Sequence, residues 1–275
     1  MVTKRDYTAE AVEAAKAVLL EIPLILGEYY DHIVLVGGWI PALLSPATSE
    51  PHTGSIDVDL ALDHTQLQEE GYKTILKLLL KNGYRQGTQS FIFMREVKIG
   101  DRFYQVEVDL LAGEYEGTSP RHRHQTVQDV MARKARGCDL SFSMNQEVTI
   151  EGRLPNGALI KRSLKIATIV PFIVMKGYAI SSRIKEKDAY DIYYCLVNYP
   201  GGIDSIAAAF RPHLSNCLVT RALTNIAEHF SSVEHLGPRQ VADFYDIPPS
   251  EEREIRIRDA YERVHYFLMR LGVIT

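Results

Sequence analysis

The 275-residue sequence predicts an α+β protein, in which a mixed sheet flanked by helices is followed by a helical C-terminal region. In the first half, β-branched and alternating runs are joined by glycine-containing turns, which is typical of strands and hairpins. After Ile166, apolar residues recur at helical spacing, and the breaks fall at proline and glycine. We therefore expect two domains, at residues 1–165 and 166–275.

The first half begins with a helix at residues 8–28, which Thr8 can cap. A β-branched run at 32–36 predicts a buried strand, Gly37-Gly38 makes the turn after it, and Pro41 suits the first turn of a helix. The other elements predicted here are a strand at 55–62, a helix at 66–81 capped by Asp63 or Thr65, and two hairpins, 91–99 with 102–111 and 147–154 with 158–164.

The second half shows helical periodicity with few strand signals. Pro200-Gly201-Gly202 and Gly237-Pro238 are expected to separate its helices. The predicted helices are 171–182, 188–198, 203–210, 216–230 and 250–271.

Composition limits the class of protein. The formal net charge is -4, so contact with nucleic acid requires a local basic patch. The three cysteines have neither metal-ligand nor disulfide-framework spacing. The charged N-terminal residues do not resemble a signal peptide, and no run of about 18 uninterrupted apolar residues is present. These features predict a cytoplasmic protein with no membrane partner.

Three acids are the candidate catalytic residues. Asp57 and Asp59 are two positions apart on a predicted strand, so both project from one face, roughly 7 Å apart. Asp109 lies on a later strand that could pair beside the first one and join them. Carboxylates gathered in this way repel one another unless a cation lies between them. The pattern indicates metal-dependent phosphoryl or nucleotidyl transfer, with Glu107 as an alternative or supporting acid.

Magnesium suits such a site because it prefers hard oxygen ligands completed by phosphates and water. Two Mg²⁺ ions, or Mn²⁺ in their place, could be held by Asp57 and Asp59, with one also held by Asp109. The Gly37-Gly38 turn could bind the β- and γ-phosphates of a nucleoside triphosphate through backbone N–H groups, aided by the Ser55 hydroxyl.

The order Gly37-Gly38, Asp57-x-Asp59 and a strand-borne Asp109 resembles the signature of the nucleotidyltransferase superfamily with the polymerase-β-like palm. The second half is similar to the AbiEii/AbiGii-type nucleotidyltransferases, the toxin components of type IV toxin–antitoxin systems. The positions that carry this likeness are Lys176, Ala179, Arg183, Lys187, Asp188 and Asp191. It covers roughly residues 30–200.

The resemblance implies an enzyme that binds an NTP and uses Mg²⁺. Gly37 and Gly38 would touch the triphosphate, and Asp109 would assist deprotonation of the acceptor hydroxyl. Lys176 would contact the nucleotide phosphates, with Asp188 or Asp191 orienting Lys176 or Arg183 or completing the site. The helical domain would complete the nucleotide and acceptor cleft. Some members of the family modify the acceptor end of tRNA, which implies an RNA acceptor, and toxins of this type pair with an antitoxin protein.

Other interpretations remain open from the sequence. Relatives often carry arginine where this chain has Thr53, which weakens the expectation of phosphate contacts there. The basic run at residues 121–136 is either an RNA-backbone patch or a solvated face. The polar residues from Arg183 to Asp191 could form a salt-bridged surface. The acceptor could be a small hydroxylated molecule such as an aminoglycoside, or the chain could be a non-catalytic module that binds a nucleotide or a partner.

Overall fold

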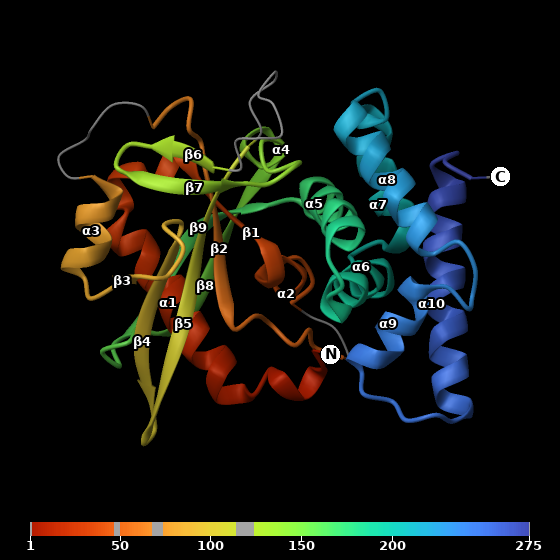
Figure 1. The fold of residues 1–275 in the computed structure, drawn as a ribbon, viewed down its shortest axis with the longest axis horizontal. Coiled ribbons are helices and arrows are strands. Elements are labelled where there is room, and N and C mark those ends of the chain that lie inside the picture. Colours follow the sequence, from red (N-terminus) through yellow and green to blue (C-terminus); the bar gives the residue numbers. More distant parts are fainter. Residues whose placement is uncertain (1, 47–49, 68–73, 114–123, 275) are drawn as a thin grey trace. The chain divides into compact units, whose positions relative to one another are not determined.

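The computed structural model describes residues 2–46, 50–67, 74–113 and 124–274 (Figure 1). The chain divides into two compact units. The sheet unit contains Thr8–Ile40 and Gly54–Thr168, and the helical unit contains Met1–Tyr7, Pro41–Thr53 and Ile169–Thr275. The division therefore falls after residue 168, close to the position predicted at 165, but two short N-terminal segments belong to the helical unit.

The fold is α+β with a mixed, open sheet, as the sequence predicts. The strands are β1 (Ile33–Val36), β2 (Asp57–Leu62), β3 (Arg85–Gln86), β4 (Ile92–Ile99), β5 (Arg102–Ala112), β6 (His124–Val127), β7 (Val130–Lys134), β8 (Asn145–Arg153) and β9 (Leu159–Ala167). The elements between the strands are α1 (Ala9–Ile25), α2 (Ile40–Leu44), α3 (Ile75–Lys81) and α4 (Leu140–Ser143), with 3₁₀ turns at Gly27–His32 and Gly37–Trp39.

Among the described residues, the sheet has the strand order β3-β4-β5-β2-β1-β9-β8, and β7 joins the end of β5 with β6 beside it. The β2–β5, β1–β9 and β5–β7 pairs are parallel, and the other pairs are antiparallel. Both predicted hairpins, β4–β5 and β8–β9, are confirmed. The sheet is consequently mixed, and its centre is the parallel pair β2–β5.

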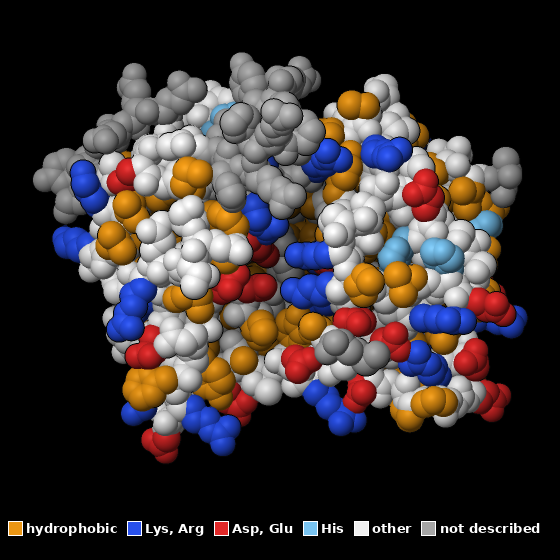
Figure 2. All heavy atoms as spheres, viewed as in Figure 1, with side chains coloured by type: hydrophobic (Ala, Val, Ile, Leu, Met, Phe, Trp, Pro, Cys, Tyr) orange, Lys and Arg blue, Asp and Glu red, His pale blue; other side chains and the backbone are white. Residues whose placement is uncertain are grey.

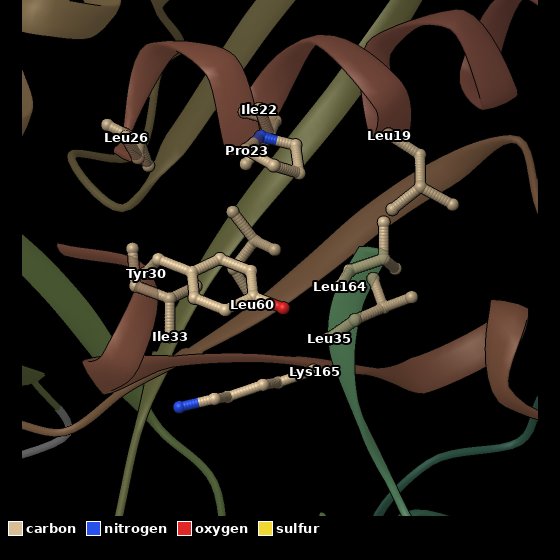
Figure 3. A pocket seen from close by; sticks show the side chains of 10 residues that line it. All are labelled: Leu19, Ile22, Pro23, Leu26, Tyr30, Ile33, Leu35, Leu60, Leu164 and Lys165. Atoms are coloured by element: carbon tan, nitrogen blue, oxygen red, sulfur yellow. The ribbon is translucent and has the colours of Figure 1, made fainter. Parts of the chain in front are cut away.

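Helix α1 covers one face of this sheet. Its first N–H groups are capped by the predicted residue, because the Thr8 side chain accepts a hydrogen bond from the Ala11 N–H. Glu21 extends from the helix to β4, where Arg95 donates two hydrogen bonds of 2.9 Å to its carboxylate. An apolar pocket lies between the helix and the strands (Figure 3), lined by Leu19, Ile22, Pro23, Leu26, Tyr30, Ile33, Leu35, Leu60, Leu164 and Lys165.

The helix predicted at residues 66–81 is confirmed at its end by α3, whereas Gln66 and Leu67 are not helical and residues 68–73 lie outside the described residues. The side chain of Asp63, the predicted cap, instead accepts hydrogen bonds from the backbone N–H and the hydroxyl of Thr65. This local Asx turn competes with helix formation at that point.

Helix α3 is capped by the turn of a hairpin that the sequence did not reveal. Thr74 is the N-cap residue, and its hydroxyl bonds to the Asp129 carboxylate. The Ile75 N–H donates to Gln128 Oε1 at 3.2 Å, and the Leu76 N–H donates to Asp129 at 3.3 Å. Gln128 and Asp129 form the two-residue turn between β6 and β7, with Gln128 at φ +53°. Partners about 50 positions away therefore determine where this helix begins.

The helical unit contains the elements of the second half and the N-terminal 3₁₀ turn Lys4–Asp6. Its helices are α5 (Ile169–Ser182), α6 (Glu186–Asn198), α7 (Gly202–Phe210), α8 (Cys217–His229), α9 (Leu236–Phe244) and α10 (Glu251–Arg270), with a 3₁₀ turn at Arg211–His213. Helices α5 and α8 pack closely, since a Cβ on Gly177 would lie 2.7 Å from the carbonyl oxygen of Ala222.

The expected break at Gly237-Pro238 is wrong, because both residues lie inside the first turn of α9. A proline there loses no hydrogen bond, since the first N–H groups of a helix have no partner within it. Phe244 at the end of α9 is buried and stacks on Tyr190 of α6, with ring centroids 4.2 Å apart. Across the described residues, none of the helices has the length and apolarity that a membrane span requires.

Candidate active site

Strand register brings the predicted acids onto one face of the sheet unit. In the parallel β2–β5 pair, Asp59 lies opposite Asp109 and Asp57 lies opposite Glu107. Side chains alternate along a strand and residues in register share a face, so the four carboxylates project from the same face. Leu60 lines the apolar pocket beneath α1, which places the acids on the face opposite that helix. The predicted register is confirmed, while the catalytic role of these residues remains a prediction.

The predicted glycine turn is in direct contact with one of these acids. Gly37 has φ +74°, in the left-handed region that favours glycine. A Cβ added to Gly37 would lie only 1.9 Å from Asp59 Oδ2. The Asp59 carboxylate therefore occupies the space that any other residue at position 37 would fill. Gly37 serves both the turn and the close approach of the acid.

The start of β2 is held by two side chains. The Ser55 hydroxyl donates to Asp57 Oδ1, and Ser55 itself is 2% exposed. The indole N–H of buried Trp39 donates to the Asp57 carbonyl oxygen at 2.9 Å. Trp39 thus fixes the backbone that carries the first acid. Sequence reasoning did not foresee this bond, because nothing local links positions 39 and 57.

Arg133 is a residue of this face that the sequence did not single out. Its Nη2 lies 2.5 Å from Asp109 Oδ2, and its side chain is 39% exposed. Arg133 is on β7 opposite Leu111 of β5, so it shares the face of Asp109. The sequence placed Arg133 only within the basic run at 121–136, since the β5–β7 pairing leaves no local signal.

Cys138 lies close enough to this site for electrostatic interaction with Asp59, Asp109 and Arg133. Burial raises the pKa of its thiol well above the ordinary value, and the neighbouring Asp139 adds to the effect. A thiol held neutral in this way is a poor nucleophile. Cys138 is therefore not expected to act as a nucleophile.

The donor set fits a hard divalent cation. Carboxylate oxygens from Asp57, Asp59 and Asp109 share one face beside the Gly37 contact. Within the described ranges, no group of three or more His, Cys, Asp or Glu side chains is arranged so that it could hold a metal ion. Mg²⁺ commonly takes only one or two carboxylates and completes its shell with phosphates and water. The two adjacent acids Asp57 and Asp59 fit that pattern, whereas Asp109 is engaged by Arg133.

The other predicted site residues lie in the helical unit and form a buried ionic cluster. Lys176 of α5 lies 2.7 Å from Asp188 Oδ1 and 2.7 Å from Asp191 Oδ2, both on α6. Arg183 Nε lies 2.8 Å from Asp188, and Lys187 Nζ lies 2.9 Å from Asp191. Asp188 therefore contacts Lys176 and Arg183, while Asp191 contacts Lys176 and Lys187. Of the alternative of a salt-bridged surface, the i,i+4 pair Lys187–Asp191 is present, but both aspartates are 0% exposed and so do not lie on a surface.

Charges in this cluster stabilise one another. Burial disfavours the charged form of Lys176, but Asp188 and Asp191 outweigh it and raise the pKa of the ammonium group. Burial would raise the pKa of Asp188, yet Lys176 and Arg183 lower it to about 2. The pKa of Asp191 is lowered in the same way by Lys176 and Lys187. Lys176, Asp188 and Asp191 therefore stabilise one another in their charged forms.

His52 attaches the segment before β2 to this cluster. Its Nε2 lies 2.9 Å from Asp191 Oδ1, and the side chain is 0% exposed. The ring stacks on Tyr190, with centroids 5.3 Å apart. Burial and the nearby Lys187 lower the pKa of His52 to about 4, although the bond to Asp191 opposes the shift. His52 is therefore neutral at pH 7, and its Nε2–H donates to Asp191.

The basic run at 121–136 falls partly outside the described residues, which include only 124 onward. Its described part is the β6–β7 hairpin and the turn after it, with Lys134 half-buried and Arg136 exposed. Figure 2 shows basic and acidic side chains interspersed over the face that it presents, in keeping with the formal net charge of -4.

No protein-family model and no curated protein matches this sequence.

Proposed function

We propose that this chain is a metal-dependent nucleotidyltransferase with a polymerase-β-like palm. It would transfer an NMP from an NTP to an acceptor hydroxyl, with pyrophosphate as the other product. The observation that carries the proposal is the alignment of Asp59 with Asp109 on adjacent parallel strands, with Asp57 on the same face and Gly37 against Asp59. A mixed sheet with one face covered by α1 and acids on the other is compatible with such a palm.

The residues of this chain position the reactants and stabilise the negative charge of the phosphates, which is how phosphoryl transfer is generally catalysed. Backbone N–H groups of the Gly37-Gly38 turn bind the triphosphate, and the Ser55 hydroxyl orients Asp57. Asp109 accepts the proton of the acceptor hydroxyl. Asp57 and Asp59 would hold the Mg²⁺ ions. When bound, these ions would neutralise the charge that develops on the phosphates and on the leaving pyrophosphate.

The buried cluster of the helical unit supports a role in binding anions. Three cationic side chains face two carboxylates, and His52 adds no charge at neutral pH. The side chain of Arg183 is 46% exposed, so a phosphate in solvent can reach its guanidinium. We propose that Arg183 binds a phosphate group. Lys176 is 8% exposed and orients Asp188 and Asp191 through its buried ion pairs with them.

The acceptor that we propose is an RNA hydroxyl. Lys134 and Arg136 follow Arg133 along β7 and the turn beyond it, at the end of β5 that carries Asp109. Their charges suit an RNA backbone. The motif resemblance adds the further proposal of a type IV toxin with a protein antitoxin.

A second candidate is transfer to a small cationic acceptor such as an aminoglycoside. Glu107 adds a fourth carboxylate to the face that holds Asp57, Asp59 and Asp109. An acidic surface of this kind would attract a polyamine-like sugar rather than a polyanion.

The deciding experiment incubates the protein with each labelled NTP, Mg²⁺ and either total RNA or kanamycin. We expect label in RNA with the wild type and none with Asp59→Asn. Asp101→Asn, at the exposed tip of the β4–β5 hairpin, is the matched control and should retain activity. Label on kanamycin would favour the second candidate. NTP binding without pyrophosphate release for every acceptor would show a non-catalytic module.

A further inference from the structure

Arg133 forms an ion pair with Asp109, the third acid of the proposed site, and so occupies one oxygen of its carboxylate. Arg133 reaches from β7 across to β5, with its Nη2 2.5 Å from Asp109 Oδ2. The guanidinium also lies over the ring of Phe91, 5.9 Å from its centroid. Asp109 is 7% exposed, whereas the Arg133 side chain is 39% exposed. The acid is therefore enclosed, and its basic partner can be reached from solvent.

A guanidinium and a divalent cation are competing partners for the same carboxylate. Asp109 can assist the proposed reaction only if its oxygens are turned toward the face shared with Asp57 and Asp59. A positive charge next to a divalent cation weakens the binding of that cation by about tenfold even when water screens the interaction. Arg133 would therefore have to leave Asp109 for the cation to bind with full affinity.

A released guanidinium would need another anion, and the proposed substrate supplies one. Arginine can form the same bidentate pair of hydrogen bonds with phosphate that it forms with carboxylate. Arg133 shares the face of the acids, and its partial exposure leaves it able to change rotamer. A triphosphate bound at this face would thus lie near the Arg133 guanidinium, which could pair with it.

We propose that Arg133 is a positioning residue that exchanges partners. It holds Asp109 while the site lacks cations, yields the carboxylate when divalent cations bind, and then pairs with the triphosphate. This inference rests on the proposed nucleotidyltransferase function and adds to it the residue that couples cation binding to nucleotide binding. It predicts opposite effects of one substitution on two ligands, which a purely structural ion pair would not produce.

The test measures Mn²⁺ binding by calorimetry, first with Mn²⁺ alone and then with ATP added at saturating Mn²⁺. Arg133→Met should bind Mn²⁺ about tenfold more tightly than the wild type and ATP about tenfold more weakly. Arg133→Lys, which keeps the charge, should bind Mn²⁺ like the wild type. Arg162→Met, on the exposed part of β9, removes the same charge elsewhere and should change neither affinity. Circular dichroism of each variant checks that it is folded.

The outcomes separate this inference from the proposed function. If the wild type binds Mn²⁺ and Asp59→Asn does not, while Arg133→Met binds Mn²⁺ no more tightly, the partner exchange is wrong and Arg133 is a permanent support for Asp109. Unchanged ATP affinity in Arg133→Met would overturn the phosphate contact. If Asp59→Asn binds Mn²⁺ as well as the wild type, the proposed cation site itself fails, and this inference fails with it.

Discussion

The most informative stability prediction concerns Lys176, because its two possible roles predict different results. Replacing Lys176 by methionine keeps most of the aliphatic volume and removes the ammonium group. Asp188 and Asp191 would then lose a partner at 2.7 Å each. If the cluster is a structural element of the helical unit, the substitution should destabilise the protein strongly. A lysine kept only to touch a phosphate would leave stability nearly unchanged.

The expected magnitude follows from burial. The Lys176 side chain is 10% exposed, and those of Asp188 and Asp191 are 1% and 0% exposed. Removing one partner of a buried ion pair leaves an uncompensated charge and costs about 3–5 kcal/mol. The pair Lys4–Glu50, in the same unit, is 41% and 45% exposed, and such pairs contribute about 0–1 kcal/mol. Lys4→Met is therefore the matched control.

The assay is urea unfolding followed by circular dichroism at 222 nm, which reports mainly the helices. With a slope near 3 kcal/mol per molar, Lys176→Met should lower the unfolding midpoint by about 1 M or more. Lys4→Met should lower it by no more than about 0.3 M. A loss below about 1 kcal/mol in Lys176→Met would refute the reasoning, and loss of nucleotide binding in that stable variant would assign Lys176 to the phosphates.

Two further predictions use the same measurement of stability. Gly37→Ala should lower the free energy of unfolding more than Gly157→Ala. Both glycines have positive φ, which costs an alanine about 1–2 kcal/mol, but only at Gly37 would the new Cβ collide with Asp59. Trp39 fluorescence can follow both variants, and equal losses would contradict the contact. Wild-type stability should fall by about 2 kcal/mol between pH 8 and pH 5, because the pKa of His52 is lowered from 6.5 to about 4 and the unfolded chain binds the proton first. His52→Gln should remove this component of the pH dependence, and an unchanged pH dependence in that variant would show that His52 does not cause it.

The regular parts of the fold were predictable because their signals are local. Gly100-Asp101 between two alternating runs predicts a hairpin, and Ile99 does pair with Arg102 around that turn. Thr8 was predicted as a helix cap and is one. The face shared by Asp57 and Asp59 follows from strand periodicity alone. Each of these features depends on residues only a few positions apart.

The features that escaped prediction depend on contacts between distant parts of the chain. Helix α3 starts where the Gln128-Asp129 turn satisfies its first N–H groups. Arg133 meets Asp109 only because β7 pairs with β5. His52 is buried against Asp191, which lies 139 positions further along the chain. A single sequence contains no local signal for such pairings, so the acids could be predicted while their partners could not.

The central claim is that Asp57 and Asp59 hold divalent cations beside the Gly37-Gly38 turn, with Asp109 on the same face. The most direct measurement is an anomalous diffraction map of crystals grown with Mn²⁺ and a non-hydrolysable NTP. The account predicts Mn²⁺ peaks at the carboxylates of Asp57 and Asp59, the triphosphate against the glycine turn, and Arg133 moved from Asp109 to a phosphate. Manganese or triphosphate bound elsewhere on the protein, with these acids unliganded, would contradict it.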